Sequence, residues 1–450
     1  MARAEGLAET NMRILLVAEN ISLRLSGETL LPCCYFEQFV AGGEDVHLLC
    51  HERVREDLRA DLPPDQFARV RFVKDRPLQN VLFRLGRRFP YRVEDLVFNQ
   101  LIQIVTQWHM RRIARDMVRE FDIDVVFQPA PIAARAVSFM HGLGAPVVIG
   151  PMSGGMNLPP AFRRMDGPVV RFSIAAARIG SAVLHRLFPG KLRAAALIVA
   201  NEQTRAALPG GIRGKVHEVM ESAVDLERWV QRPVPEKAAS EPTSFIFCSR
   251  FVDWKGIRLL VSAFAPLARS GNSMLHLVGD GELFEEIREQ IRREGLTGRA
   301  ILHGRVDRDR YQEMLRETDV YVTPSLRECG GMAMMEAMAV GLPVIGIDWG
   351  GAAQYAAPDC AMLVKPTSDQ AVIDGLTAAM ARMAASPELR RSMGGAARRH
   401  LEQAGHGWAD KAQAVLGVLR EAADGSGRSR ARSRPTSEAQ TASPSLQVAR

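Results

Sequence analysis

The feature that most constrains the fold is a regular alternation of apolar runs and amphipathic stretches in the second half of the chain. The apolar runs are FIFCSR, MLHLVGDGE, AILHGRV, VYVTPS, PVIGID and AMLVKP, in that order, and most of them are separated by stretches with helical spacing. Continuously apolar strands that alternate with helices are typical of a parallel sheet covered on both faces. We therefore predict a doubly wound α/β domain in this half.

The first half of the chain carries the same pattern less regularly. Apolar runs lie in RILLVAEN, DIDVVFQP, APVVIGPM and AALIVANEQT, and a chain of 450 residues is too long for one hydrophobic core. We predict an α/β protein with two Rossmann-like doubly wound domains that face a central cleft. The divisions that we expect are an N-terminal domain at 1–230, a linker at 231–243, a C-terminal domain at 244–405, a helix at 406–424 that can cross back to the first domain, and a disordered basic tail at 425–450.

The net charge gives little support to nucleic-acid binding. The formal charge is +7, but the segment 425–450 holds five arginines and one glutamate, and so supplies +4 of that total. The rest of the chain is close to neutral, without the basic surface that nucleic acids require. We expect no nucleic-acid partner.

The cysteines and the apolar runs indicate in which cellular compartment the protein is found. Six cysteines occur without a CxxC pair or a histidine at metal-ligand spacing, which favours buried thiols in a reducing compartment over a metal site. The N-terminal run ILLVA has no cleavage pattern behind it, and no run reaches the ~18 uncharged residues of a membrane span. We expect a cytoplasmic protein.

Basic and glycine residues follow the predicted strands of the second half, at the edge where open α/β sheets bind ligands. Arg250 and Lys255 follow FIFCS, Gly279 follows LHLV, and Arg305 and Val306 follow AILHG. An arginine fork and a lysine point charge could together hold a diphosphate. Two such cations five residues apart are more often ordinary surface charges, so this pattern alone leaves both interpretations open.

One segment, SLRECGGMAMMEAMAVGLPVIGIDWGG, is more specific. Two glutamates, Glu328 and Glu336, are separated by seven residues, and a Gly-Gly pair between them precedes a predicted helix near Met332. N–H groups at such a helix start can hold phosphate or sugar oxygens. Carboxylates accept hydrogen bonds from sugar hydroxyls, so one glutamate could hold a hexose and the other a ribose. The alternative is a carboxylate that complements the helix dipole and an ordinary helix glutamate.

Five motifs in this order and at these distances resemble the donor-binding domain of glycosyltransferase family four, the retaining nucleotide-sugar transferases of GT-B fold. The motifs are SRFVDWKG, LVGDGE, HGRV, VTPSLRECGGMAMMEAMAVGLPVIGIDWGG and MLVKP. The similarity is strong from Phe245 to about Pro366 and fainter in the first half. There, GPMSGGMNLPP resembles a segment of bacterial polysaccharide and lipopolysaccharide-type members.

The resemblance implies a role for each motif residue. Arg250 and Lys255 would neutralise the leaving diphosphate and Glu328 would bind the donor sugar, so these three are the catalytic residues that we expect. Glu336 would hold the ribose. The donor-binding set that the resemblance implies is Gly27, Gly279, Arg305, Val306, Cys329, Gly330, Gly331, Met332, Ala333 and Glu336.

The first half departs from the family at several positions. A glycine-rich loop after the first strand is matched by LSGETLLP, with Gly27. Many members place a histidine at the end of a middle strand, where this chain has Gln128, and His141 lies further along. Ser222 in VMESAVD replaces an asparagine that is common in the family, and we expect little loss from that change.

The resemblance implies transfer of a sugar from a nucleotide diphosphate sugar to an acceptor hydroxyl, with retention at the anomeric carbon. We expect no metal and no cofactor beyond the donor, because Arg250 and Lys255 would do the work of a divalent ion. The setting would be exopolysaccharide, lipopolysaccharide or other glycoconjugate synthesis. Alternatives are a GT-B sugar-nucleotide epimerase and a binding protein that kept the fold without turnover.

The acceptor that we expect is a glycan or a lipid-linked sugar at the inner face of a membrane. Arginine-rich stretches at 84–92, 111–119 and 163–193 all lie in the first half, the acceptor side in this family. Basic amphipathic segments bind anionic lipid surfaces, so we expect peripheral membrane contact. The alternative is solvated helices, with the arginines at 428–434 accounting for any lipid affinity.

Overall fold

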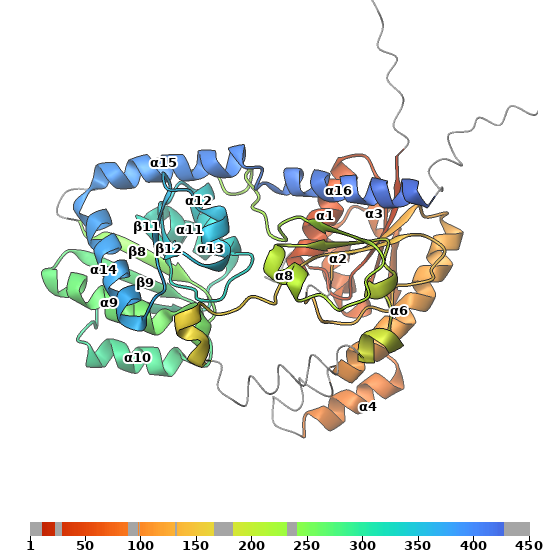
Figure 1. Ribbon diagram of the computed structural model, residues 1–450, viewed down its shortest axis with the longest axis horizontal. Coiled ribbons are helices and arrows are strands. Elements are labelled where there is room, and N and C mark those ends of the chain that lie inside the picture. The colour runs from red at the N-terminus through yellow and green to blue at the C-terminus, as the bar shows by residue number, and fades with distance from the viewer. Residues whose placement is uncertain are drawn as a thin grey trace, which may run out of the picture.

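The computed structural model describes residues 11–22, 29–88, 98, 100–130, 133–165, 183–231 and 241–426. Two domains lie side by side, and each is built on one parallel sheet (Figure 1). The prediction of two doubly wound α/β domains is therefore confirmed. Gly27 and the basic tail beyond Ser426 lie outside the described residues.

The sheet of the first domain has seven parallel strands in the order β3-β2-β1-β4-β5-β6-β7. Neighbouring side chains along β1 point to opposite faces: Ile14 and Leu16 belong to one buried cluster, and Leu15 and Val17 to another. Both faces are therefore covered. The strands are β1 (Arg13–Val17), β2 (Asp45–His51), β3 (Val70–Val73), β4 (Val125–Gln128), β5 (Val147–Met152), β6 (Ala196–Val199) and β7 (Lys215–Glu218).

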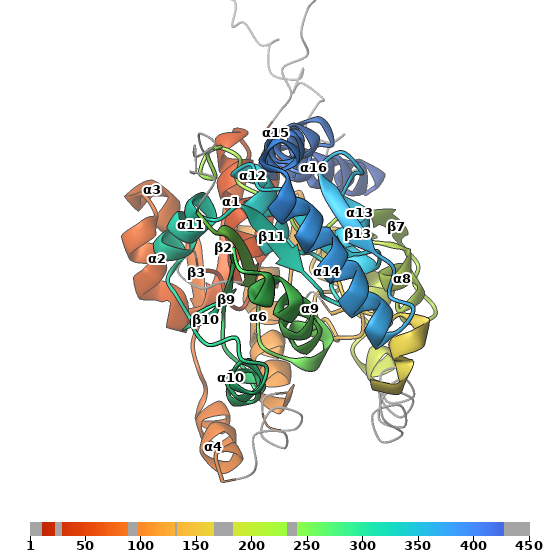
Figure 2. The same ribbon diagram turned by 90° about the vertical axis from the view of Figure 1, so that its left-hand side faces the viewer.

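Helices cover the first sheet on both sides. Helix α1 (Leu30–Ala41) and the last helix, α16 (Trp408–Gly425), pack against each other on one face, and α6 (Gln100–Glu120) lies on the other. Helix α4 (Pro77–Gly86) packs on α6 and extends away from the sheet (Figures 1 and 2). Further helices of this domain are α2 (Arg55–Asp61), α3 (Pro64–Phe67) and α8 (Glu202–Ala206).

The second domain has a six-stranded parallel sheet in the order β10-β9-β8-β11-β12-β13. Phe245 and Phe247 of β8 face one buried cluster and Ile246 faces the other, so this sheet too is buried on both sides. The apolar runs of the sequence form these strands. They are β8 (Thr243–Cys248), β9 (Ser273–Val278), β10 (Ala300–Gly304), β11 (Val320–Thr323), β12 (Val344–Ile347) and β13 (Ala361–Val364).

Two helical layers enclose the second sheet. One layer holds α9, α10 and α14, with α9 and α14 packed side by side (Figure 2), and the other holds α11, α12, α13 and α15. These helices are α9 (Ile257–Ser270), α10 (Phe284–Arg293), α11 (Arg308–Glu317), α12 (Met332–Ala339), α13 (Gly350–Tyr355), α14 (Asp369–Ala385) and α15 (Pro387–Gln403).

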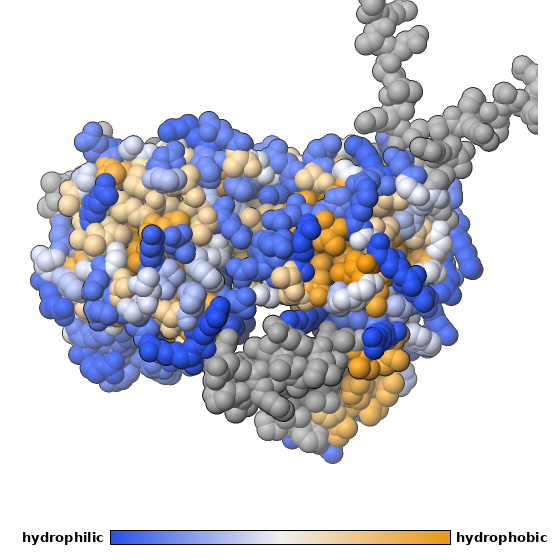
Figure 3. Space-filling view, in the orientation of Figure 1, coloured by the Kyte–Doolittle hydropathy of each residue, from blue (hydrophilic) through white to orange (hydrophobic). Residues whose placement is uncertain are grey.

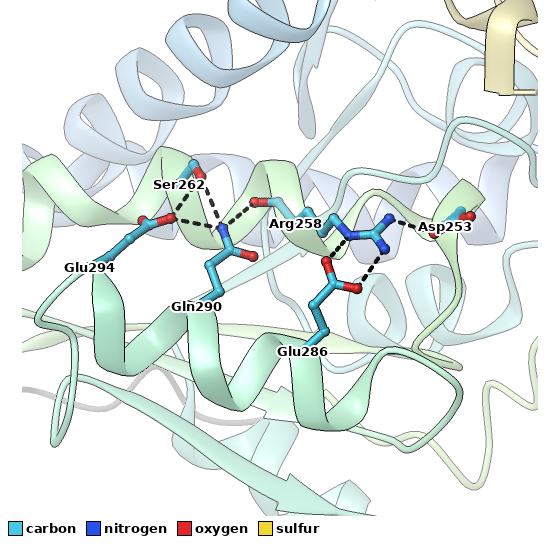
Figure 4. Close-up of polar contacts among 6 residues, drawn as sticks. All are labelled: Asp253, Arg258, Ser262, Glu286, Gln290 and Glu294. Carbon is cyan, nitrogen blue, oxygen red and sulfur yellow. Dashed lines mark hydrogen bonds and ion pairs between the residues drawn. The ribbon is translucent and has the colours of Figure 1, made fainter.

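A polar network on the outer side of α9 and α10 holds these helices to the turn after β8 (Figure 4). The Arg258 guanidinium donates to both carboxylate oxygens of Glu286, at 2.5 and 2.8 Å, and also pairs with Asp253. One turn along, the Gln290 amide donates to the Arg258 carbonyl and the Ser262 hydroxyl, at 3.0 Å each. Because Asp253 lies two residues before Lys255, this network supports the turn that carries the predicted phosphate-binding lysine.

An arm of the first domain reaches into the core of the second. After β5 the chain crosses to the second domain and forms a short 3-10 helix at Pro160–Met165 (Figure 1, yellow). Leu158 and Phe162, 3% and 2% exposed, belong to the buried cluster of the second domain that includes Phe247. The Trp349 indole donates to the Asn157 carbonyl at 2.8 Å. The domains are thus joined by this arm as well as by the linker and by the chain that leads into α16.

We predict that Phe162→Ala lowers the free energy of unfolding by about 3–5 kcal/mol, the usual cost of removing a buried phenylalanine. Met165→Ala is the control, because Met165 lies in the same 3-10 helix and is exposed, and its loss should cost within about 0.5 kcal/mol. Urea-induced unfolding of the two variants measures both values. Equal small losses would show that the arm does not contribute to the core.

Candidate functional site

The candidate site lies where the turns after β8, β9 and β11 meet at the carboxyl edge of the second sheet. Two glycines allow this approach. A Cβ on Gly279 would lie 1.9 Å from the Ser249 carbonyl oxygen, and one on Gly256, whose φ is +69°, would lie 2.2 Å from the Pro324 oxygen. The turn that carries Arg250 and Lys255 is therefore held closely between its neighbours.

Lys255 and Glu328 form an ion pair in this site. Their side chains are 16% and 24% exposed, so the pair is shielded from solvent on most sides. Arg250, in contrast, is exposed, and no ion pair of its guanidinium is found within the described residues. Of the two predicted phosphate-binding cations, one is already neutralised by a carboxylate and the other faces solvent.

Glu336 lies in α12, and its side chain is 17% exposed. Its carboxylate is 4.0 Å from the Arg308 guanidinium, which is placed over the Trp229 ring at 5.9 Å. Burial raises the pKa of Glu336 to about 7, while Arg308 and Arg228 act to lower it. A group that donates hydrogen bonds to this carboxylate would favour its ionised form.

Cys248, at the end of β8, packs against the cluster that contains Met335 and Ala337 of α12, and so lies between the turn that carries Lys255 and the helix that carries Glu336. Burial raises the pKa of its thiol to about 12. The charge of Glu336 raises that pKa further and the charge of Lys255 opposes it, so both charges act on the end of the same strand. The structure therefore brings Lys255, Glu328 and Glu336 together around the turns after β8 and β11.

The turn at 329–331 leads from Glu328 into α12. Gly331 is the N-cap of α12 with a φ of +60°, a left-handed conformation that glycine adopts without strain. The first N–H groups of a helix have no partners within it, so the groups at Met332 and Ala333 are suited to bind oxygens of a ligand. Gly351 supports the turn from behind, because its N–H donates to the Glu328 carbonyl at 2.9 Å.

Gly330 makes the tightest contact between the domains at this turn. A Cβ on Gly330 would lie 2.1 Å from the Ser222 hydroxyl and 2.9 Å from a Glu221 carboxylate oxygen. Both residues follow β7 of the first domain and are buried. Gly330 is thus required by the fit between the domains, a reason that its sequence motif does not reveal.

Other predicted residues lie at the margins of this cluster. Arg305 is exposed, and Val306 is half-buried against the cluster that contains Tyr311 and Met334. Gln128 is buried in the first domain, where it accepts a hydrogen bond from the Ser138 hydroxyl at 2.6 Å.

Sequence reasoning missed four side chains of this region. Glu221, Asn201 and Trp349 contact the other domain, and Arg308 pairs with Glu336. The only signal in the sequence was the position of Glu221 beside Ser222, where the family pattern changes. The partners of the other three are far away in the chain, so spacing alone could not identify them.

Comparisons with known proteins identify the family of the second domain. Residues 230–400 match the family described as Glycosyl transferases group 1. This match confirms the resemblance to glycosyltransferase family four that the motifs indicate.

Two curated relatives align with part of the chain. An N-acetyl-alpha-D-glucosaminyl L-malate synthase of Bacillus anthracis is 28% identical over 41% of this chain and 45% of its own length. A GDP-mannose-dependent monoacylated alpha-(1-6)-phosphatidylinositol monomannoside mannosyltransferase of Corynebacterium glutamicum is 27% identical over 41% of this chain and 51% of its own. The aligned stretches thus span about half of each relative.

Solved structures are similar over nearly the whole chain. A glycosyltransferase from Rickettsia africae has a TM-score of 0.60 at 14% identity, covering 92% of this chain and 98% of its own. HepE of Anabaena, in complex with UDP and glucose, has a TM-score of 0.57 at 15% identity, covering 91% of this chain and all of its own. This likeness confirms the two-domain GT-B fold.

We predict that Gly330→Ala destabilises the protein by about 1–3 kcal/mol, the usual cost of overpacking. Adding Ser222→Gly should restore part of the loss, because it removes the hydroxyl that the new methyl group would meet. Gly417→Ala is the control, since a Cβ on Gly417 meets nothing within 4 Å. Thermal unfolding measures the stability of Gly330→Ala, Ser222→Gly, the double variant and Gly417→Ala. An unchanged stability of Gly330→Ala would contradict the close fit.

Proposed function

We propose that this protein is a retaining glycosyltransferase that moves a sugar from a nucleotide diphosphate sugar to an acceptor hydroxyl. The observation that carries the proposal is the cluster of Lys255, Glu328 and Glu336 at the start of α12, inside the region that matches a transferase family. The epimerase and the non-catalytic binding protein are not favoured, because the matched family and the named relatives are glycosyltransferases.

In the proposed reaction, Arg250 and Lys255 stabilise the negative charge that develops on the diphosphate as the bond to the sugar breaks. Glu328 is held beside Lys255 by their ion pair, and its carboxylate oxygens accept hydrogen bonds from sugar hydroxyls. Glu336 accepts hydrogen bonds from the ribose. The departing phosphate oxygen takes the proton of the acceptor hydroxyl on the same face, and the new bond forms with retention.

The test is a screen of UDP-, GDP-, ADP- and TDP-sugars for acceptor-dependent release of the nucleotide, with and without EDTA. We expect one donor to be turned over, and we expect EDTA to leave the rate unchanged because the two side-chain cations do the work of a metal. Binding of a nucleotide without release in the presence of any acceptor would favour the non-catalytic alternative.

Arg250→Ala and Lys255→Ala should lower kcat by about 10²–10³-fold, the usual loss on removing one charge-stabilising group, with a smaller change in KM. Arg288→Ala is the control, because Arg288 is an exposed arginine of α10 that pairs with Glu285 on the outer surface. Steady-state kinetics with the donor found in the screen measures the three variants. Near-normal kcat in both site variants would place the phosphate-binding groups elsewhere.

We further propose that the acceptor is lipid-linked and that the first domain docks on an anionic membrane through the α4–α6 patch. This patch consists of exposed apolar residues on α4 and α6 (Figure 3, lower right): Leu78, Val81, Phe83, Leu85, Leu101 and Trp108. Exposed apolar residues in one patch mark an interaction surface more often than single ones do. Within the described residues, no helix combines the length and the apolar character that a membrane span needs.

Charge favours an anionic lipid surface as the occupant of this patch. Arg84, Arg87 and Arg88 are exposed on or just after α4, and the Arg112 guanidinium is placed 3.9 Å from the Trp108 ring centroid. Each basic residue near an anionic surface contributes about 1 kcal/mol, weakened by salt. The named substrate of the Corynebacterium relative, a phosphatidylinositol mannoside, is a lipid, which supports an acceptor of this kind.

We predict that the full chain and a chain ending at Ser426 both sediment with vesicles that contain phosphatidylglycerol, and less so as salt rises. Val81→Asp should reduce binding, because it places a charge in the patch. Val230→Asp is the control, since Val230 is equally exposed outside the patch. Loss of binding on truncation alone would assign lipid affinity to the tail and favour a soluble acceptor.

A further inference from the structure

The side chain of Cys329 extends from the donor loop into the first domain. The Asn201 amide donates to its sulfur at 3.4 Å. The Glu221 carboxylate lies close enough for its charge to act on this thiol, and a Cβ on the neighbouring Gly330 would lie 2.9 Å from a Glu221 carboxylate oxygen. Gly154, Asn201 and Glu221 follow β5, β6 and β7, so three neighbouring strands of the first domain each place one residue in the region of the thiol. We call these three residues the thiol socket.

Hydrogen bonds within the first domain hold the Asn201 and Gly154 parts of the thiol socket in place. Asn201 is the N-cap of α8, and its side-chain oxygen accepts the Thr204 N–H at 2.9 Å. The Thr204 hydroxyl in turn donates to the Gly154 carbonyl at 2.7 Å. Asn201, Thr204 and Glu221 are all buried. Cys329 therefore meets groups whose positions are already fixed by the first domain.

The charges around the socket match a protonated thiol. Burial and the charge of Glu221 raise the pKa of Cys329 to about 12, so the thiol keeps its proton. Burial, together with the charge of Glu328, raises the pKa of Glu221 to about 7, and the backbone of Glu221 and the charge of Lys411 act to lower it. The second Glu221 oxygen has no hydrogen-bond partner within the described residues.

We propose that Cys329 is a positioning residue whose thiol, held by Asn201 and Glu221, fixes the donor-sugar loop against the first domain. This inference rests on the proposed function and gives the side chain of Cys329 a role that the family resemblance does not, since the resemblance uses only its backbone. The loop at 329–331 begins α12, so a shift of the thiol moves the N–H groups at Met332 and Ala333.

The two parts of the donor should then depend on different contacts. The groups proposed for the nucleotide diphosphate, Arg250, Lys255 and Glu336, all belong to the second domain. The loop proposed for the sugar is held by both domains. Loss of the socket contact should therefore impair use of the complete donor and leave binding of the free nucleotide diphosphate unchanged.

The experiment compares Cys329→Ala and Cys329→Ser in the full chain. Because a misplacement of about 1 Å can cost about 100-fold in rate, we expect Cys329→Ala to lower kcat/KM for the donor by roughly 10- to 100-fold. Calorimetric titration with the free nucleoside diphosphate should give a Kd within about twofold of the natural protein, the small change expected of a site whose contacts are intact. Cys329→Ser should recover most of the rate, because a hydroxyl can donate to Glu221 and accept from Asn201.

Cys360→Ala is the matched control. Cys360 is a buried free thiol of the second domain, and its hydrogen bonds go to Ala357 of the same domain. This variant should lower stability without changing the kcat/KM of the donor relative to the natural protein. An equal loss of kcat/KM in Cys360→Ala and Cys329→Ala would mean that general destabilisation explains the effect, and it would overturn the proposal.

A thermal-unfolding cycle with Glu221→Ala, Cys329→Ala and the double variant tests the contact without any activity. We expect the double variant to lose less in unfolding midpoint than the two single variants together, because each already removes the shared contact. Additive losses, or unchanged donor kinetics in Cys329→Ala, would overturn the proposal. Failure of the natural protein to turn over any donor would instead reject the proposed function, while the cycle would still decide whether the contact exists.

Discussion

The fit of Gly330 against Glu221 and Ser222 determines how the two domains meet. A hydrogen atom is all that the gap admits, because a methyl group on Gly330 would lie 2.1 Å from the Ser222 hydroxyl. Next to it, the thiol of Cys329 meets Asn201 of the first domain. The loop that precedes α12 is therefore part of the domain interface as well as part of the candidate site. Whatever moves the first domain at this point also moves the groups that we propose for the donor sugar.

The chain connections between the domains also determine how the two domains meet. The chain leaves the first domain after β7, returns through α16, and also sends the arm with Leu158 and Phe162 into the core of the second domain. The return is fixed by pairing between Val224 and Gly407. Near the site, the Trp349 indole donates a hydrogen bond to the Asn157 carbonyl of the arm. Trp349 directly precedes Gly350, the first residue of α13. Domain contacts and site contacts thus share residues at the carboxyl edge of the second sheet.

The sequence predicted the second domain well because its strands are buried on both faces and read as continuous apolar runs. It did not indicate β3 or β7, since these are edge strands with charged residues, such as Arg71 in β3 and Lys215 in β7. Motifs located Lys255 and Glu328 at the carboxyl edge of the sheet, but their ion pair joins residues 73 positions apart and depends on the order of β8 and β11. Contacts across the domain interface, such as that of Glu221, have no periodic signal in the sequence at all.

Because of the arm, the second domain is not complete in any single continuous segment that begins at β8. A fragment that began at the first residue of β8 would have every strand of the second sheet, yet its core would be missing Leu158 and Phe162. The space that they fill would be open to water, and apolar surface in that space would become exposed. Exchange of second domains between relatives, in the laboratory or in evolution, would therefore have to carry this arm from the first half of the chain along with the second half. The segments that build the second domain are therefore not continuous in the sequence, although they form one hydrophobic core.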